Sequence, residues 1–192
     1  MLKTCFLLLA TLLLSSNALA QWELMNDEST VSYVSIKKSK VGEVNGFGTL
    51  DGSISSNGAM SVVIDLGSVD TNIPIRDERM KAMLFEVASF PTATISATLD
   101  PDALKQMKVG ETYRESVNFN LSLHGISKQL TTDVRVVKLS NNRILAVSEK
   151  PVIVSADEYN LSAGVEKLRE VASLPSISTA VPVTFSLVFG QQ

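Results

Sequence analysis

The sequence predicts an all-β protein: an antiparallel barrel of about eight strands with two or three short helices. Apolar residues recur at every second position in several segments of the 192-residue chain, and turn-forming residues separate those segments. Alternation at period two is typical of a strand with one buried face. Such strands bury their apolar faces together in a sandwich or in a closed barrel. Glycines inside one strand and a long run of hairpin-linked strands favour the barrel.

The strands follow one another along most of the chain. The clearest alternation predicts strands over Met60–Leu66, Ala93–Leu99, Val117–Leu123 and Val181–Phe189. Weaker patterns predict strands near Val31–Ile36, Val44–Ile54, Leu130–Leu139 and Arg143–Val154. Residues 55–58 (Ser-Ser-Asn-Gly) and 140–142 (Ser-Asn-Asn) are typical of tight hairpin turns. Gly46, Gly48 and Gly52 predict bends in the strand that contains them.

Two or three short helices are expected between the strands. Arg76–Leu84 places Asp77 four residues before Lys81, which predicts a supporting pair on an exposed helix face. Pro101–Met107 opens with proline, which is tolerated at a helix start. Gly164–Ala172 carries apolar residues at helical spacing.

Residues 1–20 have the pattern of a cleaved secretory signal peptide. Lys3 precedes a short apolar run, and Ala18-Leu19-Ala20 forms a small-x-small cleavage site. The alternative is a membrane anchor, but the apolar run from Phe6 to Leu14 is too short to span a bilayer comfortably. Residues 21–192 would then form one exported domain without cysteine, held together by its core alone.

Composition argues against several function classes. One His and one Cys cannot build a Cys/His metal cluster. A formal net charge of −3 provides no basic field to recruit nucleic acid. The sequence therefore predicts no metal and no nucleic-acid partner.

Three segments carry a resemblance to a known family. They are Ser68–Thr71 followed by Arg76-Asp77 and Met83–Val87, then Ser89–Ile95, and then Leu121–Lys128. In order and spacing they resemble the conserved stretches of the YceI-like polyisoprenoid-binding family. The chain departs from the family pattern at Ile95 and Leu84, where the family has phenylalanine, and in the stretch Tyr159–Ser178.

The resemblance implies a lipocalin-like barrel with an elongated apolar cavity. It also implies a periplasmic protein that binds a long isoprenoid lipid, without catalysis and without a cofactor besides that lipid. The oligomeric state, monomer or homodimer, stays open. The expected ligand-binding residues are apolar positions on the inward rows and near them: Phe47, Leu50, Phe85, Phe90, Ile95, Phe119, Leu121, Leu123, Phe185 and Leu187.

Two other functions remain as alternatives. One is a filled barrel whose surface engages envelope proteins or serves a stress response. The other is a lipid-ester hydrolase that uses His124, although no Gly-x-Ser-x-Gly motif accompanies this histidine. For each ligand-binding candidate, ordinary core packing is the competing interpretation.

Polar residues in the family-like segments have local interpretations. Asp70, Arg76 and Asp77 either meet a lipid head group or, as favoured here, form a local ion pair and cap the helix that follows. Gly125 is expected to supply a turn geometry that other residues avoid. Lys128 is expected to face solvent.

Overall fold

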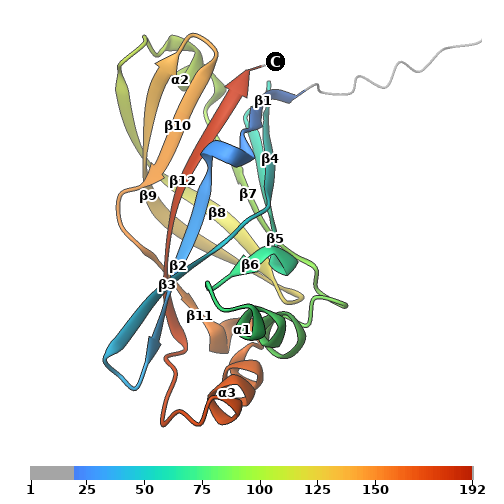
Figure 1. Ribbon diagram of the computed structural model, residues 1–192. Coiled ribbons are helices and arrows are strands. Elements are labelled where there is room, and N and C mark those ends of the chain that lie inside the picture. The colour runs from blue at the N-terminus through green and yellow to red at the C-terminus, as the bar shows by residue number, and fades with distance from the viewer. Residues whose placement is uncertain (1–19, 192) are drawn as a thin grey trace, which may run out of the picture.

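The barrel is built from eight antiparallel strands in a closed ring (Figure 1). The computed structural model describes residues 20–191. Around the ring the strands are β1 (Ala20–Leu24), β4 (Leu50–Ser55), β5 (Ala59–Asp65), β7 (Thr92–Thr98), β8 (Thr112–Leu123), β9 (Ile126–Ser140), β10 (Arg143–Ser148) and β12 (Ala180–Gln191). The ring closes because β1 pairs with both β4 and β12. The predicted fold class is confirmed.

Four further strands extend the sheet toward one end of the barrel. They are β2 (Thr30–Lys37), β3 (Val41–Phe47), β6 (Val69–Asp70) and β11 (Val152–Ser155). The strand expected over Val44–Ile54 is divided into β3 and β4, with a break at Gly48. The strand expected over Arg143–Val154 is divided into β10 and β11, and near this break the Ser148 hydroxyl accepts a 3.1 Å hydrogen bond from the Phe185 amide.

Strand β1 was not predicted, although it completes the barrel. Its five residues are too few to carry a clear alternating pattern. Trp22 is buried, and its neighbours across the two pairings are Ile54 and Gln191. The ammonium of Lys138 lies 4.5 Å from the centre of the Trp22 ring, a cation–π contact that helps to hold β1 against β9.

Three α-helices lie at the two ends of the barrel. Helix α2 (Pro101–Gln106) is at one end, and α1 (Pro74–Arg79) and α3 (Ser162–Val171) are at the other (Figure 1). A π-helical turn, η3 (Met80–Leu84), continues α1, and 3-10 turns lie at η1 (Asn26–Glu28), η2 (Leu66–Ser68) and η4 (Ala156–Tyr159). All three predicted helices are present. No helix within residues 20–191 has both the length and the apolar character needed to cross a membrane.

The expected pair between Asp77 and Lys81 is wrong. Lys81 instead contacts Glu78, with 2.9 Å between the ammonium and a carboxylate oxygen. Asp77 faces the loop before the helix, where it accepts a 2.9 Å hydrogen bond from the Thr71 amide. The Asp77 carboxylate is thus used by the amide and hydroxyl of Thr71, before the helix, and not by the lysine one turn further along.

The turn between β8 and β9 confirms the expectation for Gly125. This residue has a φ of +78°, and His124 before it has a φ of +49°. Two successive left-handed residues make the tight turn that joins Leu123 to Ile126 across the hairpin. The predicted signal peptide, residues 1–20, lies outside the described residues except for Ala20, where β1 begins.

Candidate functional site

A cavity of about 420 Å³ runs through the barrel from α2 to the end where α1 and α3 lie. Its wall is formed mainly by the inward-facing apolar rows of the strands. Strand β8 shows the pattern: Val117, Phe119, Leu121 and Leu123 line the cavity, and the alternate residues do not. The cavity exists because many of these positions hold Val, Ile, Leu or Ala, which leave the centre of an eight-stranded barrel unfilled.

Eight of the ten ligand-binding candidates line this cavity. They are Phe47, Phe85, Ile95, Phe119, Leu121, Leu123, Phe185 and Leu187. The remaining two do not. Leu50 is buried in the core beside Ile64, and Phe90 is partly buried against His124. The structure therefore brings together Phe85 and the strand candidates other than Leu50, whereas Phe90 lies in the loop before β7.

The cavity reaches the surface beside α1. Among the described residues, only two large apolar side chains both line the cavity and are exposed: Ile73, at 45%, and Ile75, at 60%. Both lie at the start of α1. Ala172, Leu174 and Ile177, after α3, line the same end. We call this end of the cavity the α1 opening. At the other end, the buried Leu104 of α2 lies against the cavity.

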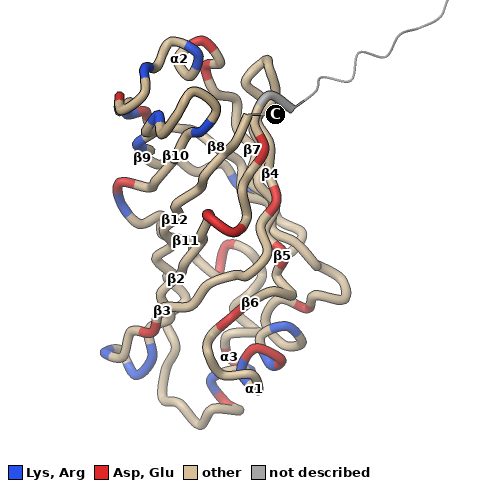
Figure 2. Tube along the Cα trace, turned by 45° about the horizontal axis from the view of Figure 1, so that its top comes forward, with Lys and Arg blue, Asp and Glu red and all other residues tan. Residues whose placement is uncertain are grey.

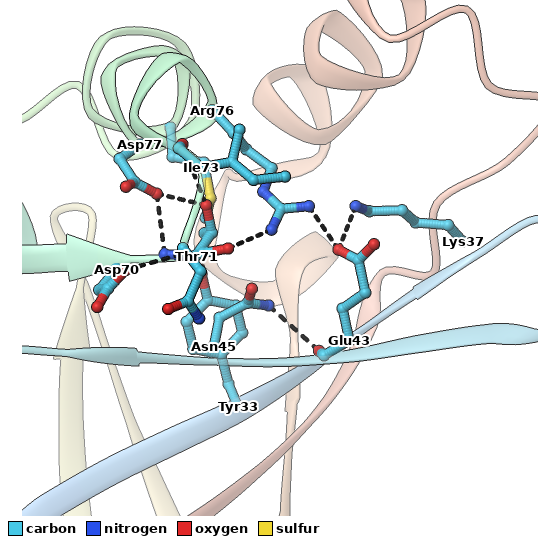
Figure 3. A network of polar contacts seen from close by, with 11 residues as sticks. Tyr33, Lys37, Glu43, Asn45, Asp70, Thr71, Ile73, Arg76 and Asp77 are labelled. Carbon is cyan, nitrogen blue, oxygen red and sulfur yellow. Dashed lines mark hydrogen bonds and ion pairs between the residues drawn. The ribbon is translucent and has the colours of Figure 1, made fainter.

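A network of polar side chains borders the α1 opening (Figure 3). Glu43 on β3 accepts hydrogen bonds from the Lys37 ammonium and from the Arg76 guanidinium, each at 2.5 Å. Arg76 also donates to the Thr71 carbonyl oxygen at 2.5 Å. The network therefore joins β2, β3 and α1 across the opening.

The charges in this network stabilise one another. The hydrogen bond from Lys37, and to a smaller extent the charges of Lys37 and Arg76, hold the pKa of Glu43 below its ordinary value. Tyr33 lies deeper, where its hydroxyl donates to the Met80 thioether at 3.5 Å, and burial raises its pKa. Tyr33 is thus a neutral phenol at physiological pH.

These polar residues correct the local interpretation of the helix start. Arg76 pairs with Glu43, which is 33 residues away, and not with Asp70 or Asp77. Asp77 holds Thr71 through the backbone amide and the hydroxyl, while Asp70 accepts from the Asn72 amide at 2.7 Å. Helix α1 begins at Pro74, and its N-cap, Ile73, has no side-chain cap.

The sequence reasoning missed the polar residues of β2 and β3 that line the cavity. Lys37, Glu43 and Asn45 lie on the inward-facing rows of these strands, in step with Tyr33 and Phe47. Their inward direction could have been predicted, because period two places them on the same strand faces as those aromatic residues. The prediction was not made because lining candidates were sought among apolar residues only.

His124 does not line the cavity. Its ring packs against that of Phe90 in a tilted arrangement, with 4.2 Å between ring centres, and its Nε2 lies 3.6 Å from a carboxylate oxygen of Glu86. Neither ring nitrogen has a hydrogen-bond partner among the described residues. Lys128, expected to face solvent, is partly exposed and lies 3.4 Å from the Glu158 carboxylate.

The acidic residues within residues 20–191 form no metal site. No three side chains of His, Cys, Asp or Glu in this part of the chain are grouped closely enough to hold a metal ion. What the site offers is an apolar chamber with a polar rim, which is the usual composition of a small-molecule site. A chamber of this kind can hold an apolar chain and orient one polar end.

The YceI-like domain model matches residues 22–189. The chain belongs to the YceI-like family. The barrel is also similar to a polyisoprenoid binding domain from Saccharophagus degradans implicated in plant cell wall breakdown. That structure is 39% identical, has a TM-score of 0.89, and is aligned over 90% of this chain and 99% of its own.

A more distant structure shares the fold. BcnA from Burkholderia cenocepacia is 17% identical, with a TM-score of 0.66 over 86% of this chain and 98% of its own. Among curated proteins, a UPF0312 protein of Yersinia pestis is 33% identical over 101 residues, which are 52% of this chain and 48% of the relative. The match thus spans about half the length of these curated relatives.

Proposed function

We propose that this YceI-like protein is a periplasmic carrier that holds a long isoprenoid-type lipid in the barrel cavity, without making or breaking a bond. The observation that supports the proposal is the largely apolar wall of the cavity, with a hydrogen-bonded polar network at its α1 opening. The similar domain from Saccharophagus degradans is described as polyisoprenoid binding, which supports the same ligand class. The signal-peptide pattern of residues 1–20 supports export.

Burial of the tail supplies the affinity. A polyisoprenoid tail has no hydrogen-bonding groups along its length, so its binding energy comes from apolar surface removed from water. At about 0.8 kcal/mol for each CH₂-sized group, twenty such groups contribute roughly 16 kcal/mol before the cost of ordering the chain. The head of the lipid would lie at the α1 opening beside Glu43 and Arg76, where polar atoms can face it.

The geometry favours this function over the two alternatives. A cavity of about 420 Å³ argues against a barrel filled by its own side chains. His124 lies outside the cavity wall and packs against Phe90, so it is not placed to act on a lipid held inside. Unchanged lipid binding by His124→Ala would agree with this placement. An ester hydrolysis activity that is lost in His124→Ala would restore the enzyme alternative.

The first test is native mass spectrometry of the protein purified from its own cell envelope, followed by lipid analysis of an organic extract. We expect one bound isoprenoid per chain. Phe119→Trp and Leu121→Trp should each abolish uptake of added polyprenol, because a larger ring on the wall fills the path of the tail. Ile153→Trp, at an exposed position of β11 that does not line the cavity, should leave uptake unchanged.

Two results would contradict the proposal. One is a protein that carries no lipid and takes up no polyprenol. The other is full uptake by both cavity variants, provided that circular dichroism shows that they fold. Equal loss in Ile153→Trp would indicate damage to the barrel and not a blocked cavity.

A further inference from the structure

Exposed aliphatic side chains surround the α1 opening. Ile73 and Ile75 line the cavity and are exposed, and Val41 on β3 is 40% exposed on the hairpin beside it. Val41 is paired with Lys37, whose ammonium contacts Glu43 in the polar network of the opening. An exposed apolar group around a cavity mouth is typical of a surface that meets another apolar phase.

The turn between β2 and β3 adds unpaired positive charge to this end. Lys38 and Lys40 are both exposed, and neither forms an ion pair with any residue in the described part of the chain. Figure 2 shows basic residues at the tip of the β2–β3 hairpin, at the end of the molecule where α1 and α3 lie. Lys38 and Ser39 have φ values of +53° and +57°, so the turn holds two non-glycine residues in the left-handed region.

The turn is a basic part of the α1 opening. Residues 37–43 contain three basic side chains and one acidic side chain, whereas the whole chain has a formal net charge of −3. The acidic one, Glu43, is bound to Lys37 and Arg76. Lys38 and Lys40 therefore present positive charge to a surface that approaches this turn.

We propose that the face around the α1 opening, formed by Val41, Ile73, Ile75, Lys38 and Lys40, docks on an anionic phospholipid surface. The inference rests on the proposed function, because an isoprenoid held in a bilayer must reach the cavity without exposing its tail to water. The aliphatic side chains enter the interfacial region, and the lysines contact the anionic head groups. Docking in this orientation joins the cavity directly to the membrane interior.

The test measures co-sedimentation of the purified protein with two kinds of vesicle, phosphatidylcholine alone and phosphatidylcholine mixed with phosphatidylglycerol. We expect binding to the anionic vesicles that weakens at high salt. Lys38→Glu with Lys40→Glu should lower the partition coefficient by about tenfold or more, since each lysine near an anionic surface contributes measurably. Val41→Ser should weaken binding further by removing apolar contact.

The matched control changes charge equally at the opposite end. Lys105→Glu with Lys108→Glu lies in and after α2, far from the α1 opening, and should leave vesicle binding within about twofold of the unmodified protein. No vesicle binding by the unmodified protein, or equal loss in this control, would overturn the docking face. Binding to both kinds of vesicle alike would overturn the role of the lysines.

Loading from detergent separates this inference from the proposed function. Native mass spectrometry of protein mixed with polyprenol in detergent reports the cavity alone. Lys38→Glu with Lys40→Glu should load normally under these conditions, because neither lysine lines the cavity, but should take up polyprenol from anionic vesicles about tenfold more slowly. Normal loading without vesicle binding would overturn the docking face and leave the carrier function standing; no loading at all would overturn the carrier function.

Discussion

At the scale of single residues, the ion pairs at the α1 opening are the most specific feature of the site. One carboxylate oxygen of Glu43 forms ion pairs with both Lys37 and Arg76. The pair with Arg76 connects a strand to a helix, so it contributes to the position of α1 over the cavity. Because Glu43 is about one-third exposed, water screens these contacts, and the net contribution to stability is modest.

Glu43 makes the stability of the protein depend on pH in a predictable direction. Its pKa in the folded state is below the ordinary value of 4.5, mainly because of the hydrogen bond from Lys37. Its stabilising contribution is therefore present above about pH 4.5 and is lost as the pH falls through the folded-state pKa. Glu43→Gln should lower the free energy of unfolding by up to about 1 kcal/mol at pH 7, and the difference should shrink as the pH falls below 4.5.

The measurement is urea unfolding of both proteins across this pH range. Lys37→Met provides the control, because it removes the largest cause of the pKa shift and should abolish most of the effect of Glu43→Gln. Parallel stability curves for the unmodified protein and Glu43→Gln from pH 7 to pH 3 would contradict the assignment.

At the scale of elements, the contact between α3 and η3 depends on a glycine. A Cβ at Gly164 would lie 2.7 Å from the Met83 carbonyl oxygen and 2.8 Å from the Leu84 Cα, and both of these atoms belong to the backbone. The two helical segments therefore approach as closely as they do because no side chain separates them. Since both α3 and η3 carry lining residues, including Leu168 and Leu84, this contact sets the shape of the α1 opening.

Gly164→Ala should destabilise the protein, although alanine is ordinarily the better helix former. Relief of the overlap requires α3 or η3 to move, which costs about 1–3 kcal/mol and outweighs the gain of up to about 1 kcal/mol in helix propensity. Urea unfolding would measure the change. Gly42→Ala is the control, because its Cβ would meet only Val34 Cγ1 at the ordinary distance of 3.6 Å. A Gly164→Ala protein more stable than the unmodified one would show that the contact is loose.

At the scale of the whole molecule, the barrel is a shell around a cavity and not a filled core. A large empty volume costs stability because the side chains that line it lose contacts across the gap. A ligand that occupies the cavity restores those contacts and binds only the folded state. Binding and folding are then linked, and the linkage is measurable.

Bound lipid should raise the melting temperature. With free lipid at about 100 times its dissociation constant, the stabilisation is about 2.7 kcal/mol. For a domain of this size that corresponds to a shift of roughly 5–10 °C. Differential scanning calorimetry of delipidated protein, with and without added polyprenol, would measure it. An unchanged melting temperature at saturating lipid would mean that the cavity does not take up the lipid.

Much of the fold and part of the site could be predicted from sequence. The alternation along β8 placed Phe119, Leu121 and Leu123 on one face, and all three line the cavity. Phe90 could not be placed in this way because it lies in a loop, where no periodicity links sequence position to direction. Leu50 shares the buried face of β4 with Ile54, which lines the cavity, but Leu50 itself does not line it, and alternation cannot tell the two positions apart.

The sequence by itself determined the local features: the strands, the hairpin at Gly125, the three helices and the apolar rows that can face a barrel interior. These follow from periodicity and turn chemistry, which depend on neighbouring residues. Only the tertiary structure decided closure by β1, the pairing of Glu43 with Arg76, the open cavity and the position of its opening. Each depends on strand register and on contacts between residues distant along the chain, which no local pattern encodes.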